Sequence, residues 1–182
     1  MGWGILIDLL VLLGLLGGII QGLRRGLAQQ FLSVMMLFLA TAFAGLLYGT
    51  LLGMFSSLGG SAATNRTGSA IVFFGLLVVF YAVLEYALHR NYPDLRIKAL
   101  GNAGNVLGAI VGFFWAMLGI SLLMVIFDYT AAVVGGQGQV VNDLFRTSYL
   151  VPLFRQFFNI PLAGLRPLFP GGLPEVLTFF AS

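Results

Sequence analysis

Residues 3–23 read WGILIDLLVLLGLLGGIIQGL, an apolar run whose only formal charge is Asp8. An α-helix rises about 1.5 Å per residue, so a run of this length crosses the roughly 30 Å hydrocarbon core of a bilayer. We therefore expect a membrane-spanning helix here, and the rest of the sequence shows how many more follow.

Three further apolar runs follow at residues 27–55, 69–88 and 103–127, separated by polar or basic segments. Of the 182 residues, 59% are hydrophobic and 8% are charged, and the mean hydropathy is +1.01. Soluble domains carry about 25% charged residues, so this composition excludes a soluble globular fold. The sequence predicts an all-α, polytopic membrane helix bundle, with a four-span domain over residues 1–129 and spans at about residues 3–23, 27–55, 69–88 and 103–127.

Basic residues near the ends of the runs predict the orientation. Arg24 and Arg25 occupy the first connection and three basic residues lie in the third, residues 89–101, whereas the second connection has only Arg66. Connections rich in Lys and Arg stay on the cytoplasmic side of the membrane. We expect the first and third connections to be cytoplasmic and both termini to lie outside.

The tail, residues 130–182, is too apolar for a disordered linker. Between residues 140 and 158 its large apolar side chains recur at helical spacing, with charged and amide residues between them. This pattern is typical of an amphipathic helix, which we expect to break near Pro152. We expect the tail to lie on the outer membrane surface or on a partner.

Glycine recurs every four residues in three of the four runs. Such series form smooth strips that let helix backbones approach closely in lipid. We interpret them as glycine zippers that pack this chain's own bundle. The alternative is that at least one strip docks another protein or a second copy. The strips comprise Gly14, Gly18, Gly22 and Gly26; Thr41, Gly45, Gly49 and Gly53; and Gly104, Gly108, Gly112 and Ala116.

Ionisable side chains within spans are candidate functional groups, and here they fall near span ends. We interpret Asp8 as an interfacial residue that caps or hydrogen-bonds near a helix start, and Asp128 as a solvated helix end. Glu85 and His89, four residues apart, are expected to form a small polar cluster at the inner boundary. Asn102 and Asn105 flank the inner end of the last span, where amides bond across helices.

The residue types and motifs of this sequence do not favour an enzyme. The chain has no cysteine, and we find no nucleotide-binding or metalloprotease motif and no metal-ligand pair. We therefore expect no catalytic site, no cofactor and no metal, although His89 could ligate a single chlorophyll-type magnesium. Scattered basic residues do not form a nucleic-acid surface. The expected partners are membrane lipid and other membrane proteins, or the chain itself through self-association.

Two ends of the chain resemble a known family. Ile7-Asp8 in an apolar span, followed by GxxxGLRRGL over residues 18–27 with Arg24 and Arg25, is similar to the opening of the colicin V production protein family of small bacterial inner-membrane proteins. Residues 100–112 (LGNAGNVLGAIVG) resemble its glycine-rich last span. Ser148 to Pro152 resembles its serine-to-proline tail signature. The family often has a basic residue next to the asparagine before that span, where this chain has Val106.

The resemblance implies a bacterial cytoplasmic-membrane protein associated with toxin production or export and with envelope maintenance, and it implies no known reaction. Our leading hypothesis is therefore a non-enzymatic assembly or support factor. The first alternative is an accessory subunit of a large energy-transducing or photosynthetic membrane complex, which the apolar tail favours. The second is a channel or transporter, which would require oligomerisation because no charge lies near the centre of any span.

Overall fold

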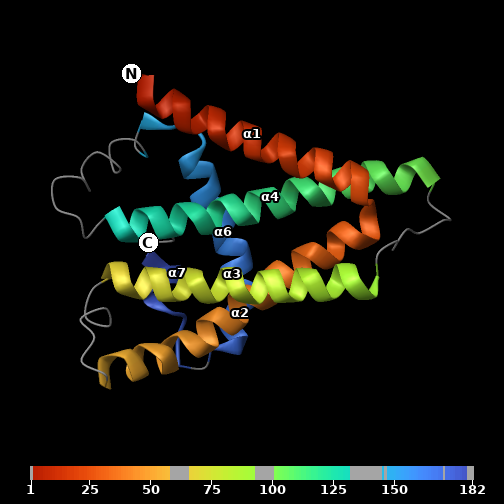
Figure 1. Cartoon of the computed structure of the whole chain (residues 1–182). Coiled ribbons are helices and arrows are strands. Elements are labelled where there is room, and N and C mark those ends of the chain that lie inside the picture. The colour runs from red at the N-terminus through yellow and green to blue at the C-terminus, as the bar shows by residue number, and fades with distance from the viewer. Residues whose placement is uncertain are drawn as a thin grey trace.

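The computed structural model describes residues 2–57, 66–92, 101–131, 145, 147–169 and 171–179. Within these ranges the chain is helical and contains no strand. Four long helices run alongside one another: α1 (Gly2–Arg25), α2 (Leu27–Ser57), α3 (Arg66–Asn91) and α4 (Gly101–Ala131) (Figure 1). Each is long and apolar enough to cross a membrane. The predicted polytopic, all-α membrane fold is therefore confirmed.

A single residue separates α1 from α2. Gly26 has a φ of 80°, a left-handed conformation that residues with a Cβ adopt only at a cost. Its backbone N–H donates to the carbonyl of Gly22 at 2.9 Å, and its own carbonyl accepts from Gln30 at 3.1 Å. Glycine at this position is the usual way to end one helix, and here the next begins at once.

The first and last spans form the most extensive contact in the bundle. A methyl group on Gly18 would overlap Ala116 and the carbonyl of Gly112, and one on Gly22 would overlap the carbonyl of Gly108. The two backbones therefore touch directly along what we call the α1–α4 seam. This close approach is available only where neither helix carries a side chain, and it favours association in lipid through dispersion contacts.

The other glycines are less uniform. Gly14 faces Ile120, and Gly104 is buried within α4. Gly45 packs against Phe169 of the tail, whereas a methyl group on Gly49 or Gly53 would meet no other atom within 4 Å. Only part of each predicted strip therefore makes a close contact, and the second strip contacts the tail instead of another span.

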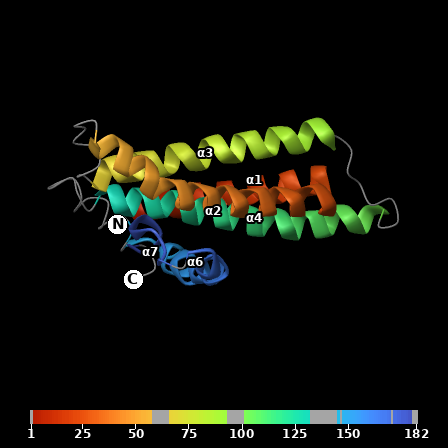
Figure 2. The same ribbon diagram turned by 90° about the horizontal axis from the view of Figure 1, so that it is seen from below.

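The tail packs on the bundle instead of extending away from it. It forms α6 (Val151–Leu165), the short 3₁₀ helix η3 (Arg166–Leu168) and α7 (Glu175–Phe179). Figure 2 shows α6 end-on beside the long helices, so α6 crosses them at a steep angle on one face of the bundle. Pro152 occupies its first turn, where a missing N–H costs nothing, so the helix begins at this proline instead of breaking there.

One face of α6 is part of the protein core. Phe154 and Phe158 are each 1% exposed, and the ring of Phe157 stacks on Phe114 of α4 with 6.2 Å between centroids. Together with Phe73 of α3 and Val125 of α4, which are fully buried, these side chains join the tail to α3 and α4. Where this tail lies relative to the lipid surface stays a prediction.

Candidate functional site

Polar side chains gather near two opposite ends of the bundle. We call one the Asp8 end, where α1 begins and α4 finishes. The other is the Glu85 end, where α1 turns into α2 and α3 finishes. Because hydrocarbon offers no hydrogen bonds, each buried polar group in a membrane bundle needs a partner within the protein, water or a ligand. The two ends meet this requirement differently.

At the Asp8 end, the carboxylate binds the start of the tail helix. Asp8 Oδ1 accepts a hydrogen bond from Ser148 Oγ at 2.5 Å and from the backbone N–H of Leu150 at 3.3 Å. Asp8 Oδ2 accepts from the N–H of Tyr149 at 3.2 Å. Ser148 Oγ in turn accepts from the N–H of Val151 at 3.3 Å. Asp8 thus binds the turn just before α6, at Ser148, which lies 140 residues further along the chain, and Ser148 in turn accepts from the first N–H of α6.

A second polar contact fastens the same helix. Arg155 Nη2 of α6 donates to Asp128 Oδ2 of α4 at 3.0 Å. Asp128 is 15% exposed, so it is a partly buried ion-pair partner and not the solvated helix end expected from the sequence. Polar groups on α1 and α4 therefore hold the start of the tail and α6 against the bundle.

At the Glu85 end, five side chains from three helices form the Glu85 cluster. Arg25 Nη1 lies 2.6 Å from Glu85 Oε1 and donates to Ser33 Oγ at 3.2 Å, while Ser33 Oγ donates to Glu85 Oε1 at 3.1 Å. His89 Nδ1 lies 2.9 Å from the carbonyl oxygen of Glu85 and 3.7 Å from its Oε1. When the amide oxygen of Gln21 faces the Arg25 guanidinium, it accepts hydrogen bonds from Arg25 Nη1 at 3.1 Å and Nη2 at 2.9 Å.

Both carboxylate oxygens of Asp8 accept hydrogen bonds, whereas polar atoms at the Glu85 end have no partner within the described part of the chain. Glu85 Oε2 is buried and no group in the described part of the chain donates to it. Gln30, one turn before Ser33 on α2, is 0% exposed, and neither its amide nitrogen nor its oxygen has a hydrogen-bond partner among the described residues. A buried polar atom without a partner costs about 1–3 kcal/mol, so each marks a place where water or a ligand would be stabilised.

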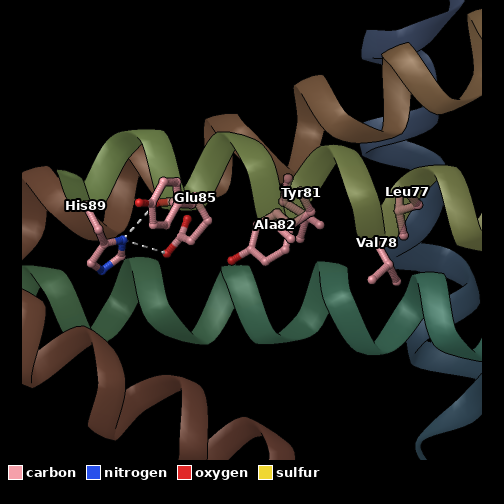
Figure 3. A pocket seen from close by; sticks show the side chains of 8 residues that line it. Leu77, Val78, Tyr81, Ala82, Glu85 and His89 are labelled. Carbon is pink, nitrogen blue, oxygen red and sulfur yellow. Dashed lines mark hydrogen bonds and ion pairs between the residues drawn. The ribbon is translucent and has the colours of Figure 1, made fainter. Parts of the chain in front are cut away.

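The Glu85 cluster adjoins a groove along α3. The groove has a volume of about 410 Å³, and its wall is apolar except at the end formed by Glu85 and His89. Figure 3 shows Leu77, Val78 and Tyr81 along the groove, with Glu85 and His89 at the end nearest the terminus of α3. Leu37 of α2 supplies a further part of the wall. The groove has the graded polarity that suits an amphiphile.

The remaining predicted residues lie apart from this groove. Arg24 and Asn102 are exposed and Asn105 is half-buried. A methyl group on Gly26 would lie 3.6 Å from Asn105 Oδ1, so α4 passes close to the α1–α2 turn. In the described ranges, no three His, Asp or Glu side chains come together in a way that could hold a metal ion.

Sequence reasoning missed Ser33 and Arg155. Ser33 was a detectable exception, because it follows Gln29 and Gln30 in an otherwise apolar run and falls one helical turn after Gln30. Arg155 was assigned only to the polar face of an amphipathic tail. Nothing in the local pattern shows that its partner is Asp128, since the two are 27 residues apart on separate elements.

One protein family matches most of this chain, including the residues of both polar ends. The family described as colicin V production protein matches residues 7–158, a range that includes Asp8, Ser148, the α1–α4 seam and the Glu85 cluster. Neither a curated protein nor a solved structure matched the chain. The match covers most of the sequence and all four candidate spans. This chain is a multi-pass membrane protein that belongs to the colicin V production protein family.

Proposed function

We propose that this protein is a non-enzymatic assembly or support factor of the bacterial cytoplasmic membrane, acting in toxin production or export and in envelope maintenance. The family match motivates this role. The observation that carries it is the α1–α4 seam, where two spans touch backbone to backbone, together with the tail bound to α1 through Ser148 and to α4 through Arg155. Transport by alternating access needs one part of a bundle to rock against another. A bundle fixed in this way is better suited to presenting a constant surface to partners.

The faces of α6 support the proposed orientation. Phe157 points along α4 toward Phe114, whereas Arg155 reaches in the opposite direction to Asp128, near the end of α4. The exposed amides Gln156 and Asn159 lie on the Arg155 side of the helical wheel. An interfacial helix places its polar face toward water and its apolar face toward lipid. We place α6 at the outer surface and the Glu85 end, with its basic residues, at the cytoplasmic side.

Cysteine labelling tests this orientation, because the natural chain has no cysteine. In intact cells, a membrane-impermeant maleimide is expected to label Asn159→Cys. It is expected to leave Asn102→Cys unlabelled until the cells are permeabilised. Both positions are exposed in the structure, so access and not burial decides the result. The reverse pattern would invert the proposed topology.

Isolation from the native membrane tests the support role. The tagged protein, solubilised in a mild detergent, is expected to migrate as a monomer or homo-oligomer, with envelope or export proteins present only in substoichiometric amounts. Deleting the gene is expected to reduce toxin export. Migration at fixed stoichiometry with an energy-transducing complex would instead make it a subunit of that complex. Gly49→Leu is a useful probe, since a Cβ at this position meets no atom within 4 Å, and Gly75→Leu on α3, where the same holds, is the matched control.

A further inference from the structure

We infer that the groove beside α3 binds one phospholipid of the adjoining leaflet, with a protonated headgroup amine at Glu85 and an acyl chain along Leu77 and Val78. This inference does not depend on the proposed support role. It rests on the shape of the groove, on the unsatisfied carboxylate oxygen at its end and on the charges around that oxygen.

The polarity of the groove matches the orientation of a lipid. Glu85 and His89 lie within two turns of Asn91, where α3 ends, whereas Leu77 and Val78 lie about two turns deeper in the span. Val78 is 47% exposed, so the apolar wall is open to the surrounding membrane. A lipid in the same leaflet places its headgroup at the helix end and its chain toward the bilayer centre. The groove therefore accepts a lipid without tilting it.

The free oxygen of Glu85 selects the headgroup. Oε1 already accepts from Arg25 and Ser33, and the Tyr81 hydroxyl lies near the same carboxylate, but Oε2 is buried and accepts no hydrogen bond from a described group. A primary ammonium supplies both a positive charge and N–H donors, and a charge-assisted hydrogen bond is roughly twice as strong as a neutral one. The quaternary ammonium of a choline lipid has the charge but no N–H. An aminophospholipid such as phosphatidylethanolamine therefore fits this atom best.

The neighbouring charges favour the same occupant. Arg25 and Glu85 neutralise each other, so a zwitterionic lipid adds no net charge to the site. Arg90 is exposed one turn beyond Tyr86, which lines the groove, and is placed to meet the lipid phosphate. A lipid with an anionic headgroup and no amine would bring negative charge toward the free Glu85 oxygen. Charge complementarity thus argues for the aminophospholipid over the anionic one.

Tryptophan fluorescence can measure this binding. The chain has two tryptophans, and Trp115 adjoins Tyr81 of the groove, so a Trp3→Phe background leaves one reporter beside the site. In vesicles, lipids brominated in mid-chain quench Trp115 when they occupy the groove. Brominated phosphatidylethanolamine is expected to compete on the order of tenfold better than brominated phosphatidylcholine, which corresponds to one charge-assisted hydrogen bond. Equal quenching by the two lipids, or stronger quenching by brominated phosphatidylglycerol, would overturn the inference.

Three variants separate the headgroup from the chain. Glu85→Gln is expected to abolish the preference for phosphatidylethanolamine while quenching by phosphatidylcholine persists; a retained preference would show that the amine does not bind at Glu85. Val78→Phe, which fills the groove, is expected to reduce quenching by both lipids. Val79→Phe changes a neighbour that is also exposed but does not line the groove, and it is expected to change nothing. Equal effects of the two phenylalanines would count against the groove, even if Glu85→Gln failed to fold.

Discussion

The carboxylates at the two polar ends of this bundle differ in how many of their oxygens accept hydrogen bonds from the described part of the chain. At the Asp8 end both carboxylate oxygens of Asp8 accept hydrogen bonds from the tail, and these bonds hold the tail to α1. At the Glu85 end one oxygen of Glu85 accepts hydrogen bonds, and the other is buried with no donor among the described residues. The difference teaches that similar residues near span ends serve different purposes: the first set fixes the fold, while the second retains binding capacity for a molecule that is not part of the chain.

The largest effect is expected at the seam that connects the two ends. Gly112→Leu would force a side chain into the carbonyl of Gly18 and the backbone of Gly22. Overpacking costs typically 1–3 kcal/mol and more where only backbone can yield, so we expect the free energy of unfolding in mixed micelles to fall by about 3 kcal/mol or more. Gly119→Leu, on the same helix but with open space before it, is the control. Similar stability of the two variants would show that the seam is not tightly packed.

The second effect is expected at the Asp8 end. Asp8→Ala removes the acceptor for three donors in the turn before α6, two of them in partly buried hydrogen bonds, and their loss costs about 1–2 kcal/mol of the free energy of unfolding. We expect limited proteolysis to cleave the tail faster while the spans stay protected. Asp8→Asn keeps an acceptor oxygen and should lose less. Unchanged tail protection in Asp8→Ala would mean that apolar burial alone holds α6.

Much of this fold could be predicted from the sequence because lipid imposes strong local rules. Each span must be a continuous apolar helix, so the expected runs at 27–55 and 103–127 fall within α2 and α4 with only small shifts of their ends. The glycine spacing indicated close packing. It could not show that Gly18 and Gly22 meet Gly112 and Gly108, since pairing depends on tertiary arrangement and not on local pattern.

The tail and the candidate site were harder to predict for a related reason. Amphipathic spacing indicated a helix after residue 140, but the helix crosses the bundle because Asp8, Asp128 and a set of buried aromatic side chains hold it there. Only the family resemblance pointed to Ser148, and nothing in the sequence pattern predicts its hydrogen bond to Asp8. Glu85 and His89 were expected to cluster because they lie on one helical face, whereas Ser33 joins them from another helix.

The third prediction compares the two carboxylates directly. Glu85→Gln retains an acceptor for Arg25 and Ser33 but loses the ion pair, whose side chains are 23% and 15% exposed. Such a pair lies between an exposed and a buried salt bridge, and with a neutral acceptor still present we expect a loss of about 1 kcal/mol in the free energy of unfolding. The loss should be smaller than that of Asp8→Ala, since Arg25 and Ser33 keep an acceptor whereas the donors at Asp8 lose theirs. A larger loss at Glu85 would make its cluster the main structural anchor.

The smallest effect is expected where the tail is fastened by an ion pair near the surface. Asp128→Asn removes the charge that meets Arg155, but the arginine side chain is 43% exposed and is therefore screened. Exposed pairs contribute about 0.2–1 kcal/mol, so we expect a loss of about 0.5 kcal/mol in the free energy of unfolding, and less at high salt. Phe158→Ala, on the buried face of the same helix, should cost about 3–5 kcal/mol and should be insensitive to salt. If Asp128→Asn instead released the tail from the bundle, charge and not apolar burial would determine where α6 lies, and the position of this helix would respond to ionic strength at the membrane surface.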